Sequence, residues 1–240
     1  MSAPVASGLV SGSIATLAIL VAVAIVALCA RGGEPAGRLR RGLIASVLLS
    51  TWLGAGWILA ERGVLAHLEL RPPPIMFFIL ISVVGAIVLG RSALGRRIAL
   101  EAPLWALVGM QAFRLPLELA MHRAVREGVM PEQMSFTGYN FDIVSGAGAL
   151  LVAVLLANGW APGWVVWLWD VIGALLLLVI VVIAVLSLPM FHAFGTTPER
   201  LNTWVAFAPY IWLPSVLVPS ALLGHILVTH RLRLAPAAAT

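Results

Sequence analysis

The chain contains 240 residues, of which 61% are hydrophobic and only 10% are charged, and its mean hydropathy is +1.04. This composition is far more apolar than that of a water-soluble domain, so lipid is the expected solvent. The net charge of +5 comes from arginines that cluster between apolar runs, a pattern that indicates membrane topology rather than nucleic-acid binding.

Apolar runs of roughly 20 residues, the length that crosses a bilayer as a helix, recur along the sequence. They predict one domain, residues 1–240, folded as an all-α transmembrane bundle of about seven helices. The first run has no basic segment before it and no cleavage site after it, so we expect it to stay as a helix. The predicted spans are Gly8–Ala30, Gly42–Ala60, Ile75–Gly90, Ile98–His122, Asp142–Asn158, Trp164–Leu188 and Ala208–Val228.

Arginine is concentrated in every second connection between these spans. The positive-inside rule therefore predicts that the N-terminus is outside and the C-terminus is in the cytoplasm. The arginines that set this orientation are Arg31, Arg38, Arg40 and Arg41, then Arg91, Arg96 and Arg97, and finally Arg231 and Arg233.

The fourth span carries an unusual polar stripe of Gln111, Arg114, Glu118 and His122. Steps of three and four residues put these side chains within an arc of about 80° at 100° per residue. An arginine inside a membrane costs about 2.5 kcal/mol or more, so Arg114 should face the bundle interior beside a partner. Glu118, one turn away, is the nearest candidate, and Pro116 between them frees a backbone carbonyl.

Two interpretations of this stripe remain open. In the first, it lines a pocket in the outer half of the bundle, where Arg114 holds an anionic group and Glu118 or His122 handles a proton. In the second, the arginine and the glutamate satisfy each other and only fix helix packing, and the histidine sits at the membrane interface.

The loop after the fourth span, Glu127–Asp142, is rich in polar and aromatic residues and is placed to act as a lid over such a pocket. Asn140 and Asp142 are candidates for binding a ligand or pairing with Arg114. We favour a capping role for Asp142, because an aspartate that precedes an apolar run commonly caps the following helix.

A second polar pair, Asp170 and His225, is predicted deeper toward the cytoplasm. Each residue lies roughly 9 Å inside its span at 1.5 Å per residue, and equal depth permits contact. Such a pair can relay protons, although a single hydrogen bond between helices, or an interfacial Asp170, would give the same pattern.

The sequence gives no sign of a metal or a cofactor. The histidines lack the HxxH, HxxxH and HExxH spacings and fall on both predicted sides of the membrane, and the single Cys29 can form no thiolate cluster. We therefore expect neither a metal nor a cofactor. The histidines are His67, His122, His192, His225 and His230.

One resemblance concerns the second half of the chain. The pattern of Phe113, Arg114, Glu118 and His122, followed by Pro131, Met134, Phe136, Gly138 and Asn140–Ile143, and later by Trp212–Pro214, Leu217–Pro219 and His225, resembles seven-helix bacterial integral membrane proteins of no known activity. The resemblance implies a multi-pass protein of the bacterial cytoplasmic (inner) membrane. Two other seven-helix groups do not fit, because the last helix lacks the HxxxH of ceramidase-like hydrolases and the lysine of rhodopsins.

These patterns favour a non-enzymatic membrane protein that binds or transports a small, anionic or lipid-like molecule at the polar stripe. One alternative is a membrane-embedded enzyme acting on a lipid through His122, Glu118 and Asp142. Another is an accessory subunit, or a homo-oligomer, assembled through a flat face rich in Gly85, Gly146 and Ala149. The expected partners are membrane lipids and a small-molecule ligand, without nucleic acid.

Overall fold

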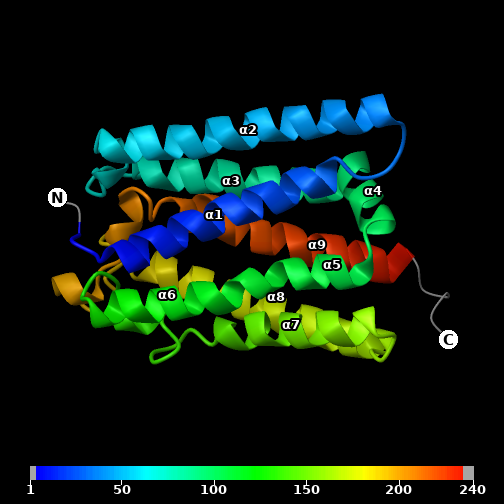
Figure 1. Ribbon diagram of the computed structural model, residues 1–240. Coiled ribbons are helices and arrows are strands. Elements are labelled where there is room, and N and C mark those ends of the chain that lie inside the picture. The colour runs from blue at the N-terminus through cyan, green and yellow to red at the C-terminus, as the bar shows by residue number, and fades with distance from the viewer. Residues whose placement is uncertain (1–3, 235–240) are drawn as a thin grey trace.

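The computed structural model describes residues 4–234, and these residues form helices joined by turns, with no strand among them (Figure 1). A 3₁₀ turn, Met110–Phe113, joins α5 to α6, and a π-helical turn, Leu213–Leu217, leads into α9. The helices are α1 Gly8–Cys29, α2 Pro35–Glu61, α3 Pro74–Arg91, α4 Ala93–Glu101, α5 Leu104–Gly109, α6 Arg114–Arg126, α7 Asp142–Ala157, α8 Gly163–Leu186 and α9 Val218–Leu234.

Five helical segments are long and apolar enough to cross a membrane: α1, α2, α3, α8, and the π turn together with α9. Their outward surfaces carry many exposed leucine, isoleucine and valine side chains, which suits contact with lipid. Together they indicate a multi-pass membrane protein. Helix α7, with 16 residues, is apolar but shorter.

The fourth predicted span has different bounds in the structure. The chain is extended at Ala102, because a residue before proline is driven out of the helical region, and α4 therefore ends at Glu101. The helix restarts at Leu104 and continues through the 3₁₀ turn to Arg126, whereas the sequence predicted Ile98–His122. The last helical segment is likewise Leu213–Leu234 instead of Ala208–Val228.

The arginine-rich connections gather at one end of the bundle, the end at which α9 finishes in Figure 1. Arg41 on α2 donates to the carbonyls of Cys29, Arg31 and Gly32 at the end of α1. The side chain of Arg231 on α9 donates to the carbonyl of Leu100 on α4.

The start of α1 and the polar loops meet at the opposite end. Ser7 donates from its backbone N–H (2.8 Å) and its hydroxyl (2.7 Å) to Glu127. Gln133 donates to the hydroxyl of Ser187 (3.1 Å) and the carbonyl of Arg200 (2.7 Å), which ties the loop after α6 to the loop after α8. The loop after α6 is therefore packed into the end of the bundle.

Helices α6 and α7 approach each other closely at Gly146. A Cβ atom added there would lie 2.3 Å from the backbone nitrogen of Leu115, so only glycine allows this distance. Gly146 and Ala149 are buried inside the bundle, and Gly85 is exposed on α3, so these three residues do not form the common outer face that the assembly alternative requires. The close approach instead brings the start of α7 beside Arg114.

Candidate functional site

The guanidinium of Arg114 contacts three other helices. It donates to Asp142 on α7 from Nε (2.6 Å) and from Nη2, to the carbonyl of Gly173 on α8 (3.1 Å), and to Nε2 of His225 on α9 (2.8 Å). Its side chain is only 1% exposed. A planar group with five donors is well suited to such a junction, because it can satisfy several acceptors in fixed directions.

Gly173 makes room for this junction on α8. A Cβ atom at Gly173 would lie 2.6 Å from the hydroxyl of Ser145 and 2.8 Å from Cε1 of His225. The absent side chain therefore lets the imidazole of His225 reach Arg114 past the backbone of α8.

His225 links Arg114 to a second carboxylate. Because arginine has only donors, Nε2 of His225 must accept, and the ring proton must sit on Nδ1. Nδ1 donates to Asp170 (2.8 Å), whose other oxygen accepts from the hydroxyl of Thr229 (2.8 Å). These contacts assign a neutral His225 between a guanidinium and a carboxylate.

Glu118 lies one turn further along α6 but makes no hydrogen bond to Arg114. Its two oxygens accept from the side-chain amide of Asn140, at 2.8 and 2.9 Å. The same amide nitrogen donates to the carbonyl of Met134 (3.0 Å), and the amide oxygen accepts from the backbone N–H of Asp142 (3.1 Å). Asn140 thus joins Glu118 to the residue that pairs with Arg114.

The other two residues of the predicted stripe lie at its margins. Gln111 is buried and donates to the carbonyl of Ala221 on α9 (3.0 Å). His122 is half-buried near the loop, with Nδ1 3.4 Å from the hydroxyl of Ser135 and its ring stacked on Phe136 at 4.6 Å. His122 therefore does not share the Arg114 junction.

Of the two partners that the sequence offered for Arg114, the structure shows the one in the following loop. Arg114 pairs with Asp142 and not with the nearer Glu118, because Asp142 lies at the start of the tightly packed α7. Asp142 makes no capping hydrogen bond at the start of α7. The predicted contact between Asp170 and His225 is present, but the two polar sites expected at separate depths are joined through Arg114.

Sequence reasoning also missed three participants. Thr229 follows His225 by four residues on α9, so helical spacing would have indicated it. Gly173 contributes a carbonyl, and the hydroxyl of Ser145 is buried beside His225 without a hydrogen-bond partner; no side-chain pattern in the sequence marks either role.

We call the connected residues the polar network: Glu118, Asn140, Asp142, Arg114, His225, Asp170 and Thr229. It contains three buried carboxylates and one guanidinium. Two cavities, of about 520 and 470 Å³, lie elsewhere in the bundle and are lined by other residues. Neither cavity reaches the network, and each of its three carboxylates accepts hydrogen bonds from other groups of the protein.

Residues 4–234 contain no group of three or more histidine, cysteine, aspartate or glutamate side chains placed to hold a metal ion. Comparison with family models, with curated proteins and with solved structures finds no match for this chain. Its function must therefore be inferred from the geometry of the polar network and the surfaces around it.

Proposed function

We propose that this protein binds or transports a small, anionic or lipid-like molecule in the bacterial cytoplasmic membrane, and that it does so together with a proton. The observation that carries the proposal is the charge balance of the polar network. Three buried carboxylates, Glu118, Asp142 and Asp170, face one guanidinium and a neutral histidine. Because uncompensated charge inside a protein is costly, this arrangement favours the uptake of a proton.

The pairing of Arg114 suggests how a proton and an anion are linked. In the closed network, both oxygens of Asp142 accept from Arg114, so the guanidinium has no free edge for an anion. An anionic group that takes the place of the carboxylate on Arg114 leaves Asp142 buried without its partner, and the cost of that unpaired charge favours the uptake of one proton by Asp142. The buried charge then stays the same before and after binding, because one proton enters with each anion.

The proposal includes seven crossings, with the N-terminus outside and the C-terminus in the cytoplasm. Beyond the five long apolar helices, α7 and the continuous segment from α5 to α6 supply the remaining two. Both pack against neighbouring helices along the bundle, and α6 carries the buried Arg114. The arginines gathered at one end of the bundle support a cytoplasmic location for that end.

A ligand-induced stabilisation experiment tests the proton link. The purified protein is titrated with inorganic phosphate, sulfate and octanoate at pH 5 and pH 7.5, and thermal unfolding is followed, since a ligand that binds only the folded state raises its stability. We expect the wild type to be stabilised by at least one anion, and more strongly at pH 5 than at pH 7.5. Asp142→Asn, which imitates the protonated carboxyl, should be stabilised at both values of pH.

Arg114→Met is the matched control, because it removes the proposed anion-binding group and should abolish the effect at both values of pH. If no anion stabilises the Asp142→Asn variant more than the wild type at pH 7.5, the proposed link is wrong, and the network only fixes helix packing. Arg97→Gln, which changes a half-exposed arginine outside the network, should respond to anions as the wild type does.

A further inference from the structure

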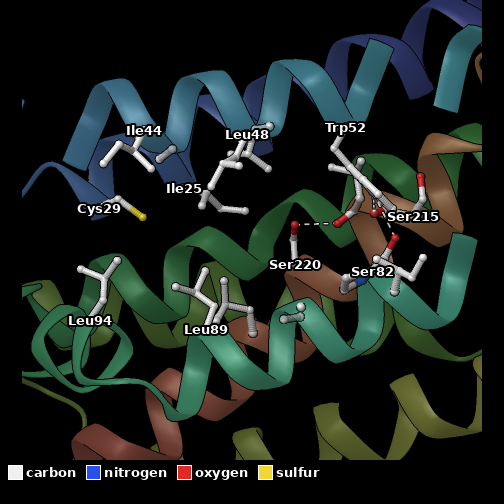
Figure 2. Close-up of a pocket in the computed structure, with 18 of the residues that line it drawn as sticks. Ile25, Cys29, Ile44, Leu48, Trp52, Ser82, Leu89, Leu94, Ser215 and Ser220 are labelled. Carbon is white, nitrogen blue, oxygen red and sulfur yellow. Dashed lines mark hydrogen bonds between the residues drawn. The ribbon is translucent and has the colours of Figure 1, made fainter. Parts of the chain in front are cut away.

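A cavity of about 520 Å³ is a groove between α2 and α3 with α1 and α9 as its base (Figure 2). From α2, Ile44, Leu48 and Trp52 point into it, and Leu89 of α3 lies opposite. The groove is separate from the polar network, so a ligand bound there is independent of the proposed function. Its size falls in the range of small-molecule sites, about 300–1,000 Å³.

Helix α2 is held to the rest of the protein at its two ends, which leaves the groove between them. At one end Arg41 donates to the carbonyls that follow α1. At the other, Trp52 stacks on Phe78 of α3 at 4.2 Å and donates to Ser82 (3.1 Å). The only buried residues of α2, Gly56 and Ala60, come after Trp52, and the half before it is only partly buried against the bundle.

The polar groups along the groove are already satisfied. The hydroxyls of Ser82, Ser215 and Ser220 donate to carbonyls one turn earlier in their own helices, at 2.9, 2.7 and 2.6 Å. Pro219 has no N–H to give to the carbonyl of Ser215, and the indole of Trp52 donates to that carbonyl instead (3.3 Å). The groove therefore offers apolar surface and suits a hydrocarbon occupant.

The length of the groove matches one leaflet of a bilayer. From Arg41 to Trp52 the helix rises about 16 Å at 1.5 Å per residue. Half of a hydrocarbon core of about 30 Å is about 15 Å. An acyl chain that enters the groove at the arginine-rich end would thus reach Trp52, which closes the other end of the groove near the middle of the membrane.

Positive charge lies where the headgroup of such a lipid would be. Arg38 is exposed one turn before Arg41, and both belong to the stripe of α2 that continues through the groove-lining residues Leu48 and Trp52. Arginine pairs well with a phosphate group. We propose that the groove binds one acyl chain of an anionic phospholipid, with its phosphate at Arg38 and Arg41.

The test measures lipid binding to the full-length protein by native mass spectrometry. The protein is freed of lipid in mild detergent and titrated with phosphatidylglycerol or phosphatidylcholine of the same acyl chains. The wild type should bind one phosphatidylglycerol with clear preference over phosphatidylcholine. Arg114→Met, which removes the anion-binding group of the proposed function, should bind it equally well, and this separates the inference from the proposed function.

Two matched pairs of variants locate the site. Gly85→Phe fills the groove at a position where an added Cβ meets nothing within 4 Å, and Gly12→Phe places the same side chain on α1, where the surroundings are equally open and lie outside the groove. We expect Gly85→Phe to weaken phosphatidylglycerol binding at least tenfold and Gly12→Phe to leave it unchanged.

For the headgroup, Arg38→Gln should weaken phosphatidylglycerol binding about fivefold, since one arginine near an anionic lipid contributes about 1 kcal/mol. Arg40→Gln, an exposed neighbour off the groove stripe, should have a smaller effect. Equal binding by Gly85→Phe and Gly12→Phe would overturn the proposal, as would equal affinity for the two lipids. The proposal would also be overturned if the wild type formed a dimer and Gly85→Phe dissociated it, because the groove would then bind a second copy of the chain.

Discussion

The substitution Asp142→Asn tests whether the Arg114 junction stabilises the bundle. It keeps the size of the side chain but removes the charge opposite a guanidinium that is 1% exposed. Breaking a buried ion pair from one side costs about 3–5 kcal/mol, because the remaining charge loses its compensation. Arg114 keeps two neutral acceptors, the Gly173 carbonyl and His225, so we expect a loss at the lower end, about 3 kcal/mol.

The assay is thermal unfolding of the purified protein in detergent at neutral pH, followed by tryptophan fluorescence. For a chain of this size, about 3 kcal/mol corresponds to a fall in Tm of roughly 6–12 °C. Arg97→Gln, which breaks the half-exposed pair with Glu101, is the control and should cost about 0.5 kcal/mol or less.

The double variant Arg114→Gln with Asp142→Asn should lose less stability than the sum of the two single losses, because it leaves neither partner of the pair charged. If the Tm of Asp142→Asn lies within about 2 °C of that of Arg97→Gln, the polar network does not hold the helices together. Additive losses in the double variant would lead to the same conclusion.

The packing and the charges around α6 lead to three more predictions. Arg114→Lys keeps the charge, but an ammonium group cannot bond to three helices at once, so its Tm should lie between those of the wild type and Arg114→Met. A Tm equal to that of the wild type would show that the three-helix contacts of Arg114 do not stabilise the bundle. Gly146→Leu should prevent stable folding, measured as loss of the monodisperse species in size-exclusion chromatography, because its side chain would occupy the backbone of Leu115; a well-folded variant would show that α6 and α7 can separate freely. The backbone N–H of Ser7, Arg123 and the Ser7 hydroxyl lower the pKa of Glu127 from 4.5 to about 2. The stability that Glu127 contributes is therefore present above pH 4.5 and lost as the pH falls toward 2, so wild type and Glu127→Gln should differ in Tm at pH 6 and converge near pH 2.

The helical architecture was accessible from the sequence, whereas the pairing of helices was not. Apolar runs mark spans because a helix that crosses the hydrocarbon must be apolar on its surface and must pair its own backbone groups. The five long apolar helical segments lie where such runs were predicted. The break at Pro103 follows a local rule of backbone sterics, but the long apolar stretch around it concealed it in the hydropathy pattern.

The candidate site shows the same division. Spacing on one helix correctly placed Arg114 in the interior, since that depends only on the cost of a charge in lipid. The sequence left both Glu118 and Asp142 as candidate partners, because the choice depends on how closely α7 approaches α6, and Gly146 decides that distance. The contact between Asp170 and His225 was predicted from their equal depth in the membrane. Depth can be estimated from the sequence, because each residue of a helix adds about 1.5 Å from the end of the span.

The order of the chain gives the Arg114 junction a consequence for the synthesis of the protein. Every group that satisfies this guanidinium, on α7, α8 and α9, is translated after α6 itself. When α6 first reaches the membrane, its arginine has no partner there, so we expect this segment to remain beside the insertion machinery or at the water interface until the last helix arrives. Assembly of the second half of the bundle would then be a single late event, completed only when His225 has left the ribosome.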